Sequence, residues 1–395
     1  MQPTTDVSVR PVETSAESDL FLRLPERLGG AAAGWSVPLL VEARWLADPR
    51  TSPILQGWEV ARFLAWRDGR VVGRITAARP LPPAEAPGSF GFLVLEPDAA
   101  ILRALLGAAR SWLWRRGVAR WRGPMSVSIN HEIGAQIAGF GRPGSLHMPT
   151  TPDWLPAMLD AVGLDAAGLA REMTLHACLL RVAEERHRAR AARLLAAWEG
   201  AGDLVIRRFD RRRYAAESLL VATLYNDGWA ANWGAQAIGP EEAAGIGRLM
   251  RPALLMGEVF FAIWRGRPIG LCAILPDPTA AIEACGGRLL PWGWLRLARA
   301  MLPGGTDRAR IPLLGTIAAM RGTPASAHAM AALLSAAIDQ ASRRGWAEVE
   351  ISWILDTNLR MRQAMARLPA PIDRSWALWG GPLEGAGTTP ENGGC

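Results

Sequence analysis

The sequence predicts an α/β protein with mixed sheets, in which one unit of strands and helices occurs twice. Residues 311–320 (IPLLGTIAAM) form an apolar run of strand length, and residues 346–355 (WAEVEISWIL) carry the β-branched and aromatic side chains of another strand. Between them, residues 326–345 are rich in Ala and Leu and end in two arginines and a glycine, which predicts a helix. A strand that leads into a helix presents N–H groups that bind phosphate, although any βαβ unit gives the same pattern.

Two β-hairpins indicate the duplication. Residues 61–78 turn at Asp68-Gly69, and residues 258–275 repeat the arrangement. The hairpin cores FLAWRDGRVVG and FAIWRGRPIG align with a gap of one residue. Two further pairs, Gly117 with Gly345 and Asn130 with Asn358, share a single spacing along the chain. We therefore expect each half to contain the order strand, helix, hairpin, strand, helix, strand.

In the first half, strands are expected at short runs of apolar and β-branched residues, and helices at amphipathic runs that end in glycine. The expected strands are 7–12, 89–96, 118–130 and 174–182, and the expected helices are 18–30 and 98–117. Residues 31–57 are dominated by Pro, Gly and Trp, which predicts a long irregular segment, and residues 131–149 are expected to form a loop.

The second half repeats the pattern with one interruption. Its expected strands include 204–210 and 375–381. The predicted domains are residues 1–183, a polar and basic linker helix at 184–203, a second domain at 204–381 with a lid insertion at 276–310, and a disordered tail at 382–395. The tail is polar and has nothing to bury.

The charge pattern argues against a nucleic-acid-binding protein. The chain has 395 residues and a formal net charge of +7, and all 44 of its basic residues are arginine. Arginine suits a surface that binds phosphates or acidic headgroups, but a genome-wide bias in composition gives the same usage. The one dense basic run, 207–213 (RRFDRRR), lacks interleaved aromatic platforms. No nucleic-acid partner is therefore expected.

The four cysteines and five histidines show no pair at metal-ligand spacing, so no metal is expected. Residues 1–19 are polar and lack the pattern of a signal peptide, and no apolar run reaches membrane-spanning length. The expected location is cytoplasmic, with reduced thiols.

Several unusual motifs are spread over most of the chain. They are WSVPLLVEARWLADP (35–49), DGRVVGRITA (68–77), RGPMSVSINHEIG (122–134), GF (139–140), LYNDGWAANWG (224–234), LPD (275–277), GRLLPWGW (287–294) and EISWILDTN (350–358). Through them and its order of elements, the chain resembles the GNAT acyltransferase superfamily, present in tandem, and more closely a bacterial family of tandem GNAT-like proteins. The resemblance implies a cleft at splayed strands, an acyl-thioester donor and an amine acceptor. The donor would be acyl-CoA or acetyl-CoA, with an acyl carrier protein as the other source.

The phosphate loop departs from the pattern that this resemblance implies. Pro324 stands where the central glycine belongs, in Arg321-Gly322-Thr323-Pro324-Ala325-Ser326, and it removes one N–H donor. A helix that begins at Pro324 behind a Thr cap would still offer the N–H groups of Ala325, Ser326 and Ala327. The first half has the acidic Glu96-Pro97-Asp98 at the equivalent place. We therefore expect Arg321, Gly322 and residues 325–327 to bind the donor, and the first half to serve as a scaffold.

Acyl transfer from a thioester to an amine needs a base and a donor for the leaving thiolate. Glu350 and Ser352 alternate onto one face of the strand at 346–355, and Asp356 follows the strand end. We expect Glu350 or Asp356 to act as the base, with Ser352 beside them. A solvated strand face gives the same alternation.

Conspicuous polar and indole side chains in loops predict the substrate-binding residues. They are Asn130, His131, Glu132, Tyr225, Asn226, Trp229, Asn232, Trp233, Trp353 and Asn358. For the group around Tyr225, a helix-capping turn with Trp in the core is the alternative interpretation.

The insertion contains LLPWGWLRLARAML (289–302), which mixes Trp, Leu and Arg. A basic amphipathic segment of this kind favours a membrane interface, and a packed lid helix is the alternative. We expect Trp292 and Trp294 to contact substrate or membrane, which would make the protein peripheral at the inner membrane.

Together these observations predict an N-acyltransferase that moves an acyl group from a thioester to an amine. The specific version is a long acyl chain placed on a sphingoid-type lipid amine, because some relatives resemble enzymes with that activity. The alternative is a catalytically silent GNAT-like pair that binds an acyl-thioester or a lipid, which Pro324 favours.

Overall fold

The computed structural model describes residues 6–383, except 49, 51, 53–54, 82–85, 183–202 and 369. The expected linker helix at 184–203 therefore lies outside the described residues, apart from Asp203. The expected tail at 382–395 also lies outside the described residues, apart from Pro382 and Leu383. Below, the first half means residues up to 182 and the second half means residues from 203.

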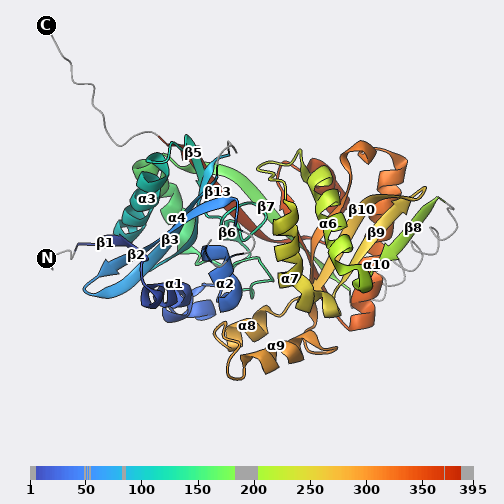
Figure 1. Cartoon of the computed structure of the whole chain (residues 1–395), viewed down its shortest axis with the longest axis horizontal. Coiled ribbons are helices and arrows are strands. Elements are labelled where there is room, and N and C mark those ends of the chain that lie inside the picture. Colours follow the sequence, from blue (N-terminus) through green and yellow to red (C-terminus); the bar gives the residue numbers. More distant parts are fainter. Residues whose placement is uncertain are drawn as a thin grey trace, which may run out of the picture.

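One sheet of 13 strands runs through the described part of the chain (Figure 1). The strands of the first half are β1 (Ser8–Pro11), β2 (Trp58–Arg67), β3 (Arg70–Pro80), β4 (Gly88–Leu95), β5 (Arg120–Gly123), β6 (Ala135–Ala138) and β7 (Ala170–Arg181). Those of the second half are β8 (Leu204–Arg208), β9 (Glu258–Trp264), β10 (Arg267–Pro276), β11 (Arg308–Thr316), β12 (Glu348–Leu355) and β13 (Ile372–Pro382). Both expected hairpins, β2–β3 and β9–β10, are antiparallel pairs.

The two halves exchange their last strands at the centre of the sheet. The strand order is β1-β2-β3-β4-β5-β13-β7-β12-β11-β10-β9-β8, with β6 paired to β13. The last strand of the second half, β13, thus lies between β5 and β7 of the first half. In turn, β7 pairs with β12 of the second half. The sheet of each half is therefore completed by the other half, which two self-contained domains would not require.

The helices flank this sheet. In the first half they are α1 (Ser15–Arg27), α2 (Leu40–Ala47), α3 (Ala99–Trp114) and α4 (Trp154–Ala167), with the short 3-10 helix η1 (Gly30–Ala33). In the second half they are α6 (Tyr214–Trp229), α7 (Pro240–Met256), α8 (Thr279–Ala284), α9 (Gly293–Met301), α10 (Pro324–Arg344) and α11 (Leu359–Ala366), with η2 (Arg211–Arg213) and η3 (Ala318–Met320). The sequence predicts an irregular segment at 31–57, but part of that segment forms the helix α2, so the expectation is wrong there.

Alternating side chains of β9 and β10 separate two cores in the second half. Phe260 and Cys272 pack with the Ala- and Leu-rich face of α10. Their neighbours Phe261 and Leu271 pack on the opposite face with side chains of α6 and α7. The sheet of the second half is thus covered on both faces, by α10 on one and by α6 and α7 on the other (Figure 1).

The strands β11 and β12 splay apart. They pair in parallel only where Arg308–Ile311 lie beside Glu348–Ile351. Pro312 follows this pairing and has no N–H to donate to a neighbouring strand. The residues of β11 and β12 beyond this point are free to line a space between them.

The equivalent splay in the first half is filled. There, β4 and β5 pair only at Gly88 with Trp121 and at Ser89 with Arg122. The strand expected at 118–130 ends at Gly123, and the segment from 124 to 134 packs into the gap, where Met125 N donates to Phe90 O at 2.7 Å. A cavity of about 70 Å³ remains.

We predict that Gly91→Ala destabilises the protein, because a Cβ at this position would overlap the carbonyl group of Met125. Overpacking against backbone costs about 1–3 kcal/mol or more. The matched control is Gly107→Ala in α3, where a Cβ meets no atom within 4 Å. This control should stabilise the helix by up to about 1 kcal/mol. Urea denaturation of both variants checks the prediction, and equal midpoints would contradict it.

Candidate active site

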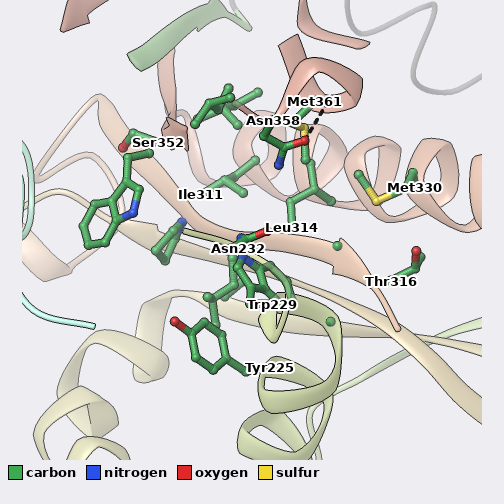
Figure 2. A pocket seen from close by; sticks show the side chains of 18 of the residues that line it. Tyr225, Trp229, Asn232, Ile311, Leu314, Thr316, Met330, Ser352, Asn358 and Met361 are labelled. Atoms are coloured by element: carbon green, nitrogen blue, oxygen red, sulfur yellow. Dashed lines mark hydrogen bonds between the residues drawn. The ribbon is translucent and has the colours of Figure 1, made fainter. Parts of the chain in front are cut away.

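A cavity of about 1340 Å³ occupies the splay in the second half. Residues 312–316 of β11 line one side of it, and residues 351–355 of β12 line the other. Its lining also includes Val221 of α6 and Leu254 of α7, on one face of the sheet, and Leu334 of α10, on the other. The cavity therefore passes through the sheet. Figure 2 shows Tyr225 and Trp229 on one side of the strands, and Met330 and Met361 on the other.

The cavity brings together most of the residues that the sequence predicts. They are Asn130 and His131 of the first half, Tyr225, Trp229, Asn232 and Trp233, the donor-loop residues Arg321, Gly322, Ser326 and Ala327, and Ser352, Trp353 and Asn358. The other predicted residues, Glu132, Asn226, Ala325, Glu350, Asp356, Trp292 and Trp294, do not line it. Asn226 instead holds the backbone of Ile238, by donating to its O at 2.9 Å and accepting from its N at 2.8 Å.

A hydrogen bond between the halves forms one polar wall of the cavity. The hydroxyl of Tyr225 donates to Asn130 Oδ1 at 2.5 Å, and Asn130 Nδ2 donates to Gln236 O at 3.3 Å. The Tyr225 ring stacks on Trp229, with ring centroids 5.2 Å apart. Burial raises the pKa of Tyr225 to about 12, so its phenol stays protonated at neutral pH.

His131 is a buried and neutral imidazole in the same wall. It is 7% exposed, and its Nδ1 lies 3.1 Å from Ser128 Oγ. Its Nε2 has no hydrogen-bond partner among the described residues. Burial, followed by the charge of His147, lowers the pKa of His131 to about 4. The ring therefore carries no charge at neutral pH.

Sequence reasoning missed His147 and Glu42, which lie beside His131. His147 lines the cavity, and its Nε2 lies 2.5 Å from Glu42 Oε1. Burial alone would lower the pKa of His147, but the carboxylate of Glu42 outweighs burial and raises it. The pair joins α2 to the loop that follows β6, two segments without a shared sequence signal.

The donor loop differs from its expected form. Thr323 caps α10, since its Oγ1 accepts from Ser326 N at 3.1 Å and its O accepts from Ala327 N at 3.2 Å. The expectation that Ser326 and Ala327 offer free N–H groups is therefore wrong. Within the described residues, only the N–H groups of Gly322 and Ala325 remain without an acceptor in this loop.

The Arg321 side chain already forms a hydrogen bond within the protein. Its Nη2 donates to the carbonyl of Gly228 near the end of α6, and the side chain is half-buried rather than exposed. Sequence reasoning missed a second arginine here. Arg360 of α11 also lines the cavity, and its guanidinium lies 3.8 Å from the position that a Cβ of Gly322 would occupy. Arg360 is exposed and has no ion-pair partner in the described part of the chain.

The geometry argues against Glu350 as the base. Its carboxylate is 2% exposed, forms an ion pair with Arg374, and accepts from Ser145 Oγ at 2.9 Å and Ser352 Oγ at 2.6 Å. Burial alone would raise the pKa of Glu350, but the charges of Arg374 and Arg310 outweigh it and lower that pKa. A carboxylate that stays ionised, and whose oxygens are already occupied, is a structural anchor.

The other two catalytic candidates are placed differently. Ser352 lines the cavity and is fixed between Glu350 and Arg310, whose Nε donates to Ser352 Oγ at 2.9 Å. Asp356 lies outside the cavity, half-exposed, with Arg362 Nη1 at 2.6 Å and His176 Nε2 at 3.3 Å. Its surroundings are those of a surface ion pair.

The insertion does not cover the cavity. Of residues 276–310, only Arg310, which belongs to β11, lines the cavity, and the segment before β11 packs on the first half. Leu40 N donates to Gly287 O at 3.0 Å, and Arg288 pairs with Glu26 at 2.6 Å. In the view of Figure 1, the insertion helices α8 and α9 lie below α2 and α7. The lid prediction is therefore wrong.

Trp292 and Trp294 are 69% and 49% exposed, so a role in lining the substrate cavity is wrong for them. Among the helices that the structure describes, none is both long enough and apolar enough to cross a bilayer.

Solved structures with similar folds identify the class. The chain superposes on a tandem GNAT protein from the clavulanic acid biosynthesis pathway with a TM-score of 0.56 and 16% identity, covering 97% of this chain and all of the other. A GCN5-related N-acetyltransferase from Sphaerobacter thermophilus gives a TM-score of 0.50 and 11% identity, with 96% of each chain covered. No protein-family model matches. The fold, with its cleft at splayed strands, is that of a tandem GNAT-type protein.

Curated relatives identify the family. The chain is 31% identical over 363 residues to the bacterial ceramide synthase of Caulobacter vibrioides (strain NA1000 / CB15N), covering 90% of this chain and 92% of that protein. It is 28% identical over 373 residues to protein YghO of Escherichia coli (strain K12), covering 91% of each. The chain belongs to the family of the bacterial ceramide synthase and is an N-acyltransferase of the GNAT type. The resemblance seen in the sequence is confirmed.

We predict that Glu350→Gln lowers the free energy of unfolding by about 3–5 kcal/mol, because it leaves the buried Arg374 without its main counter-charge. Since the pKa of Glu350 is lowered in the folded state, its contribution is present above the unfolded pKa of about 4.3 and is lost as pH falls through the folded value. Urea denaturation of the wild type and the variant at pH 7, and at a series of pH values from 5 down to 2, measures both effects.

The matched control is Asp356→Asn, which removes a half-exposed ion pair worth about 0–1 kcal/mol. An unchanged unfolding midpoint for Glu350→Gln, together with a large loss of transfer, would restore Glu350 as a catalytic base.

Proposed function

We propose that the protein transfers a long acyl group from an acyl thioester to a long-chain lipid amine, such as a sphingoid base. The observation that carries this proposal is the cavity through the sheet, lined by apolar side chains on both faces. Its volume exceeds the range of about 300–1,000 Å³ typical of small-molecule sites. Membership in the family of the bacterial ceramide synthase supports the same substrate class.

The α10 side of the cavity is the proposed donor side. The N–H groups of Gly322 and Ala325, with Arg360 nearby, form a small anion site at the helix N-terminus. A phosphate of coenzyme A, or of the phosphopantetheine on a carrier protein, fits this chemistry. The first half is less suited, because Asp98 caps α3 by accepting from Ala100 N at 2.7 Å and pairs with Arg67.

The α6–α7 side is the proposed acceptor side, and the reaction occurs at the splay between β11 and β12. There the neutral amine nitrogen attacks the thioester carbonyl carbon. The C–N bond forms, the C–S bond breaks, the nitrogen loses a proton, and the leaving thiolate gains one. Apolar walls from both halves exclude water, which would otherwise compete as the nucleophile.

A silent thioester-binding protein remains the second candidate. The observation that favours it is the loss of donors in the phosphate loop, where Pro324 has no N–H and Thr323 occupies those of Ser326 and Ala327. Such a protein would bind the donor without forming an amide.

The test is incubation of the purified protein with hexadecanoyl-CoA and sphinganine, with mass spectrometry of the amide product. We predict that Val221→Trp, which fills the acceptor side, lowers kcat/KM for sphinganine roughly tenfold or more, since about 1.4 kcal/mol of lost contact gives a factor of ten. Leu219→Trp, two residues earlier on α6 and exposed, should leave kcat/KM within about twofold.

Calorimetric binding of hexadecanoyl-CoA without any amide product would favour the silent binder. If the protein neither binds hexadecanoyl-CoA nor forms the amide, both candidates are refuted for this donor. Hexadecanoyl carrier protein would then be tested as the donor.

We further propose that α9 and the turn before it hold the protein on the cytoplasmic face of the inner membrane. Leu290, Trp292, Trp294 and Leu295 are exposed together there, and Arg299 lies on the same short helix. Tryptophan at a polar–apolar boundary and arginine near acidic headgroups favour such contact.

We predict that Trp292→Ala combined with Trp294→Ala reduces co-sedimentation with vesicles of phosphatidylglycerol and phosphatidylcholine severalfold, while the thermal unfolding midpoint is unchanged. Trp114→Ala is the matched control, because the exposed fraction of Trp114 lies between those of Trp294 and Trp292, and Trp114 lies on α3 of the first half. Equal loss of binding in the control, or no loss in the double variant, would contradict the membrane proposal.

A further inference from the structure

His131 lines the cavity and carries a buried hydrogen-bonding atom without a partner in the described part of the chain. The side chain is more than nine-tenths buried and lines the cavity, and its Nε2 has no partner among the described residues. An unsatisfied buried polar atom destabilises a protein by about 1–3 kcal/mol. A ligand atom that satisfies it would therefore be bound more tightly.

The hydrogen bonds of Ser128 indicate which ring nitrogen of His131 carries the proton. Ser128 Oγ accepts from the backbone N of Asn130 at 3.2 Å, and it lies 3.1 Å from His131 Nδ1. Within the described residues, Nδ1 of His131 is the one acceptor found for the hydroxyl hydrogen of Ser128. If that hydrogen is donated to Nδ1, the neutral ring carries its own proton on Nε2. Nε2–H is then a buried donor without a partner, on a side chain that lines the cavity.

We propose that His131 Nε2–H donates a hydrogen bond to the thioester carbonyl oxygen, and so stabilises the negative charge that this oxygen acquires during transfer. When the amine nitrogen attacks the carbonyl carbon, the π electrons of the C=O bond move onto oxygen, beside Nε2–H. They return when the C–S bond breaks, and His131 neither gains nor loses a proton. The inference rests on the proposed acyl transfer, and it gives the first half a catalytic residue in the cavity of the second.

The neighbours of His131 suit a donor more than a base. The lowered pKa, about 4, keeps the ring neutral at physiological pH and makes it a weak proton acceptor. His147, held by Glu42, disfavours a positive charge on His131, and Arg310 is a further cation near His147. A neutral imidazole is an effective electrophile towards a carbonyl oxygen when its pKa is lowered in this way.

The kinetic test compares two replacements of His131 with hexadecanoyl-CoA and sphinganine as substrates. His131→Leu should lower kcat by about 10²–10³-fold, as the loss of one oxyanion donor does elsewhere, and leave the Kd for hexadecanoyl-CoA within about threefold. His131→Gln keeps an N–H donor, so its kcat should be at least tenfold higher than that of His131→Leu. His176→Leu is the control, because His176 lies outside the cavity, and its kcat should stay within about threefold of wild type.

Two results would overturn the inference. If His131→Gln is as slow as His131→Leu, and the wild-type kcat falls on an acidic limb near neutral pH, His131 acts as a base. If His131→Leu keeps wild-type kcat, the residue has no catalytic role, although the proposed acyl transfer stands.

A measurement without turnover separates this inference from the proposed function. Long-range 15N–1H spectra of the full chain at pH 7, assigned with His131→Leu, should give the Nε2–H tautomer for His131. The Nδ1–H tautomer would overturn the inference even in a protein that forms amide. A wild type that forms no amide but shows Nε2–H would refute the function and, with it, the catalytic role.

Discussion

The ion pair between Arg374 and Glu350 is the interaction on which the rest of the structure depends. Arg374 belongs to β13 and Glu350 to β12, and the two side chains are almost fully buried. Ser145 of the first half donates to Glu350, and Ser352 links Glu350 to Arg310 of β11. A buried charge is tolerated only when its partners are complete. The network therefore fixes β11, β12, β13 and the loop after β6 relative to one another, at the point where the splay begins.

Strand exchange explains why the active site needs both halves. Because β7 pairs with β12, the loop that carries Asn130 and His131 is held against the cavity of the second half. The first half has filled its own splay with the segment from 124 to 134. Its contribution to the site is thus a wall rather than a second donor pocket. The duplication has produced one deep cavity from two related units.

Local signals in the sequence predict a large part of this fold. The turn at Asp68-Gly69 gives the first hairpin, and Thr323 before Pro324 gives the start of α10, because both depend on neighbouring residues. The strand exchange has no such signal, since the partner of β13 is set by packing between distant segments. Glu350 illustrates the limit. Its alternation with Ser352 predicts a shared strand face, but only the position of Arg374 decides whether that face is catalytic or structural.

In the candidate site too, features that depend on neighbouring residues could be predicted, and features that depend on distant segments could not. Conspicuous residues such as Tyr225, Asn130 and Trp353 do meet in the cavity, because unusual polar and indole groups in loops are informative. The sequence did not predict that the N–H groups of Ser326 and Ala327 are occupied, because this depends on the positions of the hydroxyl and carbonyl oxygens of Thr323. Arg321 was similarly obscured, because Gly228 lies far from it in the chain.

The place of β13 also has a consequence for the newly made chain. This strand follows every other strand that the structure describes, yet it lies between β5 and β7. During synthesis, those two strands therefore wait with open hydrogen-bonding edges until residues 372–382 have emerged from the ribosome. Open edges invite pairing with other chains. A chain that lacks this strand therefore exposes two unpaired strand edges at the centre of its sheet, which is a site for aggregation with other chains.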